Sequence, residues 1–148
     1  MKRVWIVMIA AMLTTGGWPY HQTEAADPVH DSRNGMVEKY WKLAEVSGKP
    51  VPALQGEPYL VLKADGRVIG FTGCSDFAGA YKVDAATAHI AFGQVLSIKV
   101  TCPGGAATEK AFLDALWQAD NYSLEGGRLI LIRARTAPVA RFEAGFLN

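Results

Sequence analysis

The sequence has few of the residues that build metal or redox centres. Its 148 residues include only two cysteines, Cys74 and Cys102, and three histidines. The cysteines stand at positions too far apart for the Cys-x-x-Cys spacing of low-pKa redox pairs. His21 and His30 precede the predicted domain, which leaves it with His89 alone, whereas a zinc site needs three or four convergent ligands. We therefore expect no metal and no cofactor.

The chain also lacks an excess of charge of either sign. It has 15 Lys+Arg and 14 Asp+Glu, a formal net charge of +1, and no run of one sign reaches five residues. Phosphate backbones and anionic membranes are recognised by basic clusters, so we expect neither nucleic acid nor a membrane surface as a partner. Hydrophobic residues make up 50% of the chain, which excludes disorder as its main state.

No apolar run is long enough for an ordinary membrane span. Lys2 and Arg3 precede the uncharged run 4–17, whereas a span needs about 20 apolar residues. Small residues within 23–26 fit a signal-peptidase site. The segment predicts a signal peptide over residues 1–26, and a retained N-terminal anchor is the alternative. No cysteine lies near residue 26, which excludes lipid attachment as in bacterial lipoproteins.

Removal of this signal peptide would leave a neutral domain in an oxidising compartment. It takes away Lys2, Arg3 and Glu24, which leaves 13 Lys+Arg and 13 Asp+Glu. We expect a periplasmic or secreted monomer with a flexible leader over 27–37, one domain over 38–148, and no membrane insertion after cleavage. Cys74 and Cys102 have no third thiol to compete with them, which predicts one structural disulfide.

Short apolar segments separated by turn residues dominate the predicted domain. Asp65-Gly66 lies between two such segments and is a strong hairpin signal. The predicted strands include Tyr40–Val46, Tyr59–Lys63, Arg67–Thr72, Asp76–Val83, Ala88–Phe92, Val95–Thr101, Leu129–Arg133 and Val139–Glu143.

One segment has a helical period instead. Apolar residues at positions 107, 111, 112, 115, 116 and 119 share one face, which predicts a helix over about 106–119. Asn121 is predicted to cap its C-terminus in a left-handed conformation. Strands joined by tight turns pair antiparallel. The fold class is therefore α+β and mainly antiparallel β, a curved sheet or small open barrel of about seven or eight strands with one helix packed on it.

The remaining conspicuous residues have structural interpretations. Gly70, Gly73 and Gly79 do not form a phosphate loop, and we expect bulges or close backbone approaches there. Asn121-Tyr122-Ser123 matches a glycosylation sequon, which we interpret as a coincidence. Most of a set of seven aromatic residues are expected in the core, and a binding groove lined by some of them is the alternative: Trp41, Phe71, Phe77, Tyr81, Phe92, Phe112 and Phe142.

No catalytic constellation is evident. The stretch 73–77 (GCSDF) has Phe77 where a nucleophile elbow needs glycine, and it joins two strands instead of a strand and a helix. We expect Ser75 and Asp76 to hydrogen-bond backbone in a turn. The predicted catalytic set is therefore empty.

Much of the domain resembles a known family. The stretch Asp65–Tyr81 (DGRVIGFTGCSDFAGAY), Trp41-Lys42-Leu43, Cys102-Pro103 ahead of the helix and the final Arg141-Phe142 resemble the META domain, the fold of the heat-shock protein HslJ and its secreted relatives. The resemblance covers roughly residues 38–146. Ser75 replaces the family's usual Asn, and residues 98–101 (IKVT) replace its usual Thr-Arg-Met-Ala.

The resemblance implies a small envelope or secreted module without catalytic activity, linked to stress tolerance, whose two cysteines pair. Three functions stay open on this sequence. The first is a non-catalytic envelope module that binds an unknown envelope protein or component under stress. The second is a small-ligand carrier that uses the mouth or interior of the barrel. The third is a thiol-dependent or hydrolytic enzyme.

Overall fold

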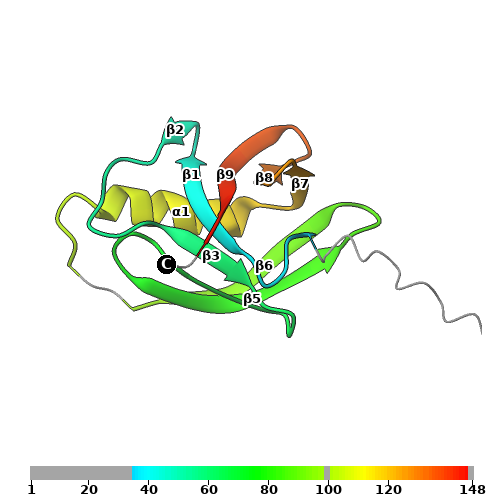
Figure 1. Ribbon diagram of the computed structural model, residues 1–148, viewed down its shortest axis with the longest axis horizontal. Helices are drawn as coiled ribbons and strands as arrows, with labels where there is room; N and C mark the ends of the chain where they lie inside the picture. Colours follow the sequence, from blue (N-terminus) through cyan, green and yellow to red (C-terminus); the bar gives the residue numbers. More distant parts are fainter. Residues whose placement is uncertain (1–34, 99–100, 147–148) are drawn as a thin grey trace, which may run out of the picture.

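The computed structural model describes residues 35–98 and 101–146 (Figure 1). The predicted signal peptide and most of the predicted leader lie outside these residues. The elements in chain order are β1 (Tyr40–Val46), β2 (Lys49–Pro50), β3 (Tyr59–Leu62), β4 (Arg67–Phe71), β5 (Asp76–Asp84), β6 (His89–Ser97), α1 (Ala106–Gln118), β7 (Asn121–Glu125), β8 (Arg128–Arg133) and β9 (Ala137–Gly145).

The nine strands form one antiparallel sheet that nearly closes into a ring. Their order is β2-β1-β3-β4-β5-β6-β7-β8-β9, and β1 also pairs with β9. The ring is weakest between β6 and β7, which are paired only through His89 and Asn121. The predicted class, α+β and mainly antiparallel with a curved sheet or open barrel and one helix, is confirmed, and the sheet has nine strands where about seven or eight were expected.

Helix α1 covers this weak side of the ring (Figure 1). It packs against β1, β6, β8 and β9 and buries Phe112, Ala115 and Leu116. The Phe112 ring lies edge-on to Phe77 at 5.4 Å between centroids and tilted against Phe142 at 5.7 Å. The apolar face predicted from the helical period therefore fills the space that the strands enclose.

The end of the helix differs from the sequence prediction. Its last backbone bond runs from the Ala119 amide to the Ala115 carbonyl at 3.0 Å, and Ala119 is already extended with φ −67° and ψ 130°. Asn121 is the first residue of β7, so its predicted role as a left-handed cap is wrong. The chain passes directly from the helix into a strand, which leaves no room for a capping turn.

The core begins before residue 38. Met36, within the predicted leader, is fully buried, and its carbonyl accepts a hydrogen bond from the Trp41 indole nitrogen at 2.8 Å. Val37 forms an isolated parallel bridge with Leu62. The buried indole thereby obtains the acceptor that a tryptophan N–H in a core requires.

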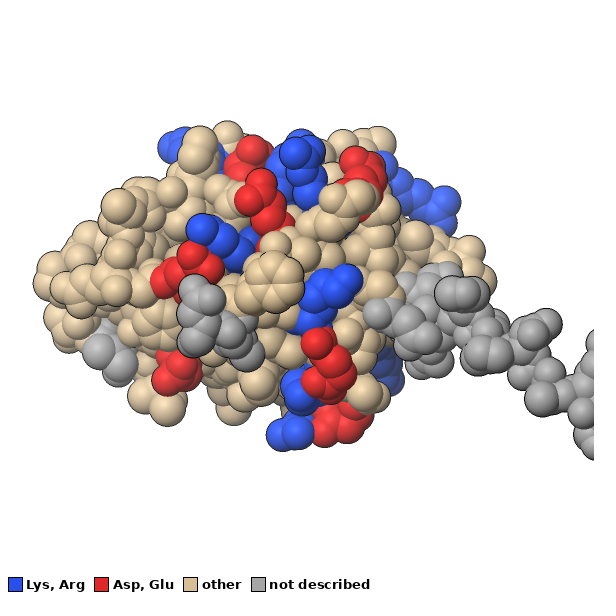
Figure 2. Space-filling model, in the orientation of Figure 1, with Lys and Arg blue, Asp and Glu red and all other residues tan. Residues whose placement is uncertain are grey.

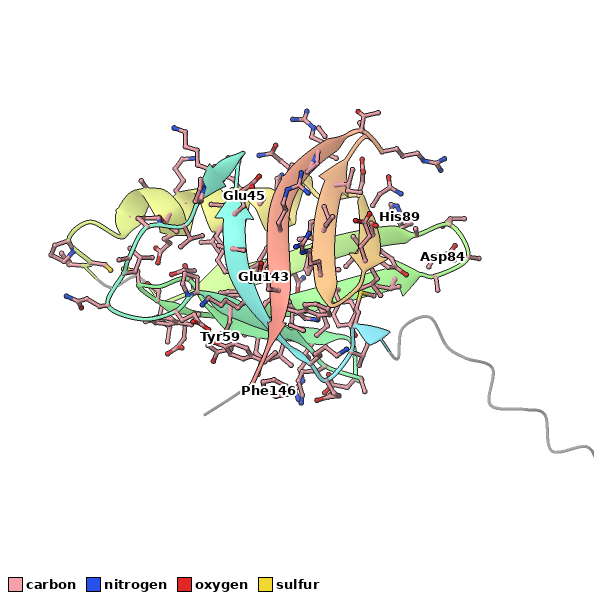
Figure 3. The ribbon with its side chains drawn as sticks, turned by 45° about the horizontal axis from the view of Figure 1, so that its top comes forward. Glu45, Tyr59, Asp84, His89, Glu143 and Phe146 are labelled. Carbon is pink, nitrogen blue, oxygen red and sulfur yellow. The ribbon has the colours of Figure 1, made fainter. Side chains whose placement is uncertain are left out.

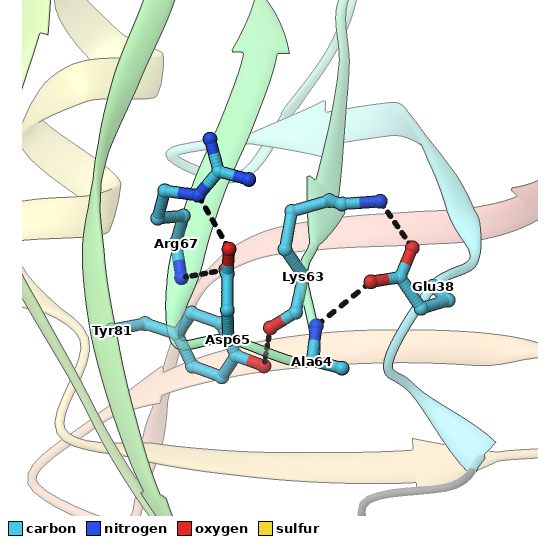
Figure 4. Close-up of polar contacts among 6 residues, drawn as sticks. All are labelled: Glu38, Lys63, Ala64, Asp65, Arg67 and Tyr81. Atoms are coloured by element: carbon cyan, nitrogen blue, oxygen red, sulfur yellow. Dashed lines mark hydrogen bonds and ion pairs between the residues drawn. The ribbon is translucent and has the colours of Figure 1, made fainter.

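The predicted Asp65-Gly66 hairpin joins β3 to β4 (Figure 4). Gly66 has φ +87°, and the Asp65 carboxylate accepts hydrogen bonds from the backbone and the guanidinium of Arg67 at 3.0 and 2.7 Å. These bonds lower the pKa of Asp65 below its usual value. Beside the turn, Glu38 is paired with Lys63 and accepts the Ala64 amide at 2.8 Å, which lowers the pKa of Glu38.

The predicted strands Ala88–Phe92 and Val95–Thr101 meet in one continuous strand, β6, which ends at Ser97; residues 99–100 of the second prediction lie outside the described residues. A bulge divides it at Gln94, which has φ +51°, and the register against β5 shifts there. Opposite the bulge, a Cβ on Gly79 would lie 2.9 Å from the Val95 Cα. A glycine at this position lets the two backbones approach, as expected for a glycine inside a strand.

The aromatic cluster of α1 gives the first stability prediction. We expect Phe112→Ala to lower the free energy of unfolding by about 3–5 kcal/mol, because it leaves a cavity against Phe77 and Phe142. Trp117→Ala on the same helix is the control, since Trp117 is 79% exposed and its removal should change stability by no more than about 0.5 kcal/mol. Urea unfolding followed by circular dichroism measures both; equal losses would contradict the packing role of Phe112.

Candidate functional site

The structure brings the two predicted site residues together. Cys74 lies in the turn between β4 and β5, and Cys102 lies in the loop before α1. A Cβ on Gly105 would lie 2.6 Å from the Cys102 sulfur and 3.6 Å from the Cys74 Cβ, so both side chains border the helix start. Both are thiols in the structure. The disulfide stays a prediction, and this proximity supports it.

The neighbouring thiol suppresses ionisation of Cys74. The side-chain hydrogen bond with Cys102, followed by desolvation, raises the pKa of Cys74 to about 11. A nucleophilic or redox-active cysteine needs the opposite shift, because the thiolate is the reactive form. In the thiol state this shift works against a nucleophilic role for Cys74.

A buried threonine ties the cysteine turn to the helix. The Thr72 hydroxyl donates to Glu109 Oε2 at 2.8 Å and accepts the amides of Ser75 and Cys74 at 2.9 and 3.2 Å. Glu109 belongs to the first turn of α1. One side chain thus organises the β4–β5 turn and attaches it to the helix N-terminus. We refer to Thr72, Cys74, Ser75, Cys102 and Glu109 as the cysteine junction.

The cysteine junction shows no pattern of acid–base catalysis. The Ser75 hydroxyl is buried and has no hydrogen-bond partner among the described residues. It lowers the pKa of Cys74, but by less than the Cys102 thiol and desolvation raise it. His89, the histidine of the predicted domain, lies at the far end of the β5–β6 hairpin, as Figure 3 shows. Within residues 35–98 and 101–146, no three His, Cys, Asp or Glu side chains are placed to hold a metal ion.

A more extensive feature lies on the outside of the sheet. Residues directly opposite one another on paired strands share a face. The register forms an apolar row across β1, β3, β4, β5 and β6, on the face away from the core: Tyr40, Val61, Ile69, Ala78 and Leu96. Tyr59 and Phe71 form part of the adjacent row, and Ile98 follows β6. We call these eight residues the outer apolar stripe.

The outer apolar stripe becomes more exposed toward β6. At its β1 end the rings of Tyr40 and Tyr59 stack at 4.4 Å and are half-buried. At the β6 end Leu96 is 76% and Ile98 71% exposed. Phe71 belongs to this outer surface, so its predicted place in the core is wrong; the other six predicted core aromatics are buried.

Charged groups border the stripe near β1. Glu57 accepts the Tyr40 hydroxyl at 3.2 Å and pairs with Lys42 at 2.8 Å. Desolvation, followed by the charge of Glu57, raises the pKa of Tyr40 to about 12. Figure 2 shows positive and negative side chains mixed on the viewed face, in small groups with uncharged surface between them. The exposed Phe146 and Tyr59 lie on the same side of the molecule in Figure 3.

The inside of the ring is occupied by side chains. Trp41, Phe112 and Phe142 are the largest fully buried groups. A cavity of about 530 Å³ lies instead between the β1–β2 turn and the start of α1, lined by groups that include Val46, Pro50 and Ala111. No helix among the described residues has the length and apolarity to cross a membrane.

These features can be compared with known proteins. The META domain pattern matches residues 34–146. The chain belongs to the META domain family. The predicted resemblance is confirmed, including the helix, the hairpin and the cysteine-bearing turn that carried it. No curated protein matches the sequence.

Solved structures support the same fold. A duf4847 family protein from Bacteroides vulgatus aligns with a TM-score of 0.60 at 15% identity, over 79% of this chain and 99% of its own. A protein from Burkholderia xenovorans, solved by NMR, aligns with a TM-score of 0.58 at 20% identity, over 88% and 99% of the two chains. At such identities the likeness shows the fold alone.

The raised pKa of Cys74 predicts the pH dependence of its alkylation. In the reduced META domain, Cys74 should react slowly with iodoacetamide at pH 7, and its rate should rise until the pH exceeds about 11, because only the thiolate attacks. Peptide mass spectrometry after timed alkylation measures the rate. In Cys102→Ser the midpoint should move down, since the thiol that is the largest cause of the shift is replaced. A midpoint near pH 8.5 in the unmodified domain would contradict the coupling.

Thr72 gives a second prediction for the cysteine junction. Thr72→Val should lower the free energy of unfolding by about 1–3 kcal/mol, because it leaves buried amides without their acceptor and Glu109 without its donor. Thr72→Ser, which keeps the hydroxyl, is the matched control and should lose less. Urea unfolding of both reduced variants measures the difference, and equal losses would show that the methyl group matters more than the hydrogen bonds.

Proposed function

We propose that this META domain is an exported, non-catalytic module that binds an envelope protein through the outer apolar stripe. The single observation that carries the proposal is the run of exposed apolar side chains that ends in Leu96 and Ile98. Contiguous exposed apolar surface on a soluble domain is typical of interaction sites. Export is proposed from residues 1–26, and the link with stress from the family resemblance.

The interior of the domain supports binding on the outside. An enzyme or a carrier with an internal site needs a cavity large enough for its ligand, and polar groups that converge on that cavity. Here core side chains fill the ring, and the buried hydroxyl of Thr72 attaches the β4–β5 turn to the helix. The outer apolar stripe takes no part in filling the ring or in attaching the helix.

A small-ligand carrier is the second candidate. The cavity of about 530 Å³ beside the β1–β2 turn favours it, because this volume suits a small apolar molecule. Native mass spectrometry of the protein purified from the envelope tests it. An extra mass that is lost in Ala111→Phe would support the carrier, and a bare protein would count against it.

The proposed function is tested by complementation. A strain that lacks this protein should become sensitive to heat or envelope-damaging agents, and a plasmid copy of the wild-type chain should restore tolerance. Leu96→Glu should fail to restore it, because a charge at the exposed end of the stripe opposes burial against a partner. Ala91→Glu is the control, since Ala91 is also exposed on β6 but pairs with Lys82 away from the stripe.

The interpretation depends on equal amounts of folded protein. Both substitutions are at exposed positions and should change stability by about 0.5 kcal/mol at most, so immunoblots should show the same level. Full rescue by Leu96→Glu, or an unchanged phenotype of the deletion strain, would contradict the proposed function.

A further inference from the structure

Most of the side of β6 that faces away from β5 is unpaired among the described residues and is not protected against pairing. Beyond Ile90, whose amide bonds to the Asp120 carbonyl at 3.1 Å, no described residue pairs with β6 on the side away from β5. The amide directions alternate along a strand, and the Ile98 amide points toward β5, to the Asp76 carbonyl at 3.2 Å. Counting back from Ile98, the amides of Ser97 and Val95 therefore point away from β5, to the open side.

The residues along this edge are unusual for an exposed strand. Proteins commonly blunt free edges with lysine, proline or a very short strand. Strand β2, at one end of the strand order, has all three features, since it consists of Lys49 and Pro50 alone. Residues 91–98 (AFGQVLSI) contain no charged residue and no proline. The bulge at Gln94 interrupts the hydrogen-bond ladder at one point only, and residues 95–98 lie beyond it.

Apolar groups lie on both faces of this edge. On the outer face Leu96 and Ile98 are the most exposed members of the outer apolar stripe. On the inner face a groove of about 160 Å³ lies between β6 and α1, lined by Phe92, Gln94, Val95, Leu113 and Trp117. Trp117, at 79% exposure, is the large exposed side chain of this groove.

We propose that the open edge of β6 binds an extended apolar segment of a partner protein, which adds to the sheet as a further strand. Its backbone would bond to Val95 and Ser97. Side chains on one of its faces would lie beside Leu96 and Ile98, and those on the other would enter the groove under Trp117. This inference rests on the proposed function and names the chemistry of its partner.

The geometry favours a single strand over a second folded copy. Strand addition needs a free row of backbone groups and pockets for alternate side chains, and β6 offers both. Helix α1 contacts β6 and contributes Leu113 and Trp117 to the groove, so the edge lies in a notch. An isolated extended chain fits such a notch, whereas the edge of another sheet would bring its neighbouring strand against the helix.

The probe is a fluorescein-labelled peptide of alternating valine and threonine with terminal lysines, titrated with the full-length protein and followed by fluorescence anisotropy. Two further peptides carry N-methyl groups on alternate residues, one set for each edge of the peptide. N-methylation removes the donors of one edge and leaves the side chains. We expect one methylated peptide to lose binding at least about tenfold and the other to bind like the parent.

Two variants locate the peptide. Trp117→Ala should raise Kd about tenfold, as expected for an aromatic group at the centre of a contact, and Phe146→Ala, at a 91% exposed aromatic outside the groove, should leave Kd unchanged. Hydrogen exchange by NMR should slow at least about tenfold at the Val95 and Ser97 amides when the peptide is bound.

Each contrary result has a separate meaning. Equal binding of all three peptides would overturn strand addition and leave side-chain binding by the outer apolar stripe intact. No binding of any peptide, or a dimer in sedimentation that Trp117→Ala dissociates, would also overturn the inference. These results do not test the proposed function, which would instead be contradicted by full complementation with Leu96→Glu.

Discussion

The burial of Phe112 between Phe77 and Phe142 is the contact on which the rest of the structure depends. Strand pairing closes the ring through β1 and β9, but β6 and β7 meet at only one residue pair. An antiparallel sheet with such an opening would expose its inner apolar face to water. The ring of Phe112 enters that space from α1 and contacts β5 and β9 at once. The helix thus replaces the strand pairing that β6 and β7 lack.

The helix is fixed at both ends by polar contacts with the sheet. At its N-terminus Glu109 accepts the Thr72 hydroxyl, next to the cysteine pair. Beyond its C-terminus the Asp120 carboxylate accepts the Ala134 amide at 2.9 Å, and the Asp120 carbonyl accepts that of Ile90. A disulfide between Cys74 and Cys102 would add about 3.5 kcal/mol at the first of these attachments in the chain-entropy picture. The same arrangement has a cost, because a helix on this side leaves the edge of β6 without a neighbour.

The sequence predicts helices and turns better than it predicts strand register and which side chains are buried. The helix and the Asp65-Gly66 hairpin follow from local signals, a 3.6-residue period and turn chemistry, so they could be placed within one or two residues. Met36 could not be found, because the few apolar residues of the polar segment 27–37 show no period. The outward position of Phe71 was also beyond prediction. In β3 and β4 both alternating positions are apolar, so the pattern cannot say which face is the core until the register is known.

The outer apolar stripe needs the same knowledge of register, since its members come from five strands. The cysteine junction was predictable as a pair of cysteines, but Thr72 and Glu109 were not, because they are 37 residues apart in the chain and are joined by a single hydrogen bond. Long-range polar contacts of this kind leave no local pattern. The sequence therefore pointed to the two cysteines that lie together, but not to the surface that we propose as a binding site.

Sheet stability alone does not account for the whole outer apolar stripe. Cross-strand pairs on a solvent face contribute about 0.2–1 kcal/mol each, and the stacked, half-buried Tyr40 and Tyr59 fit that role. Leu96 faces Ala78, a small residue that leaves most of the leucine in water. A leucine in that position adds little to the sheet, yet it keeps an apolar group beside the open edge of β6. Sheet stability therefore accounts poorly for the β6 end of the stripe, and binding of a partner there accounts for it better.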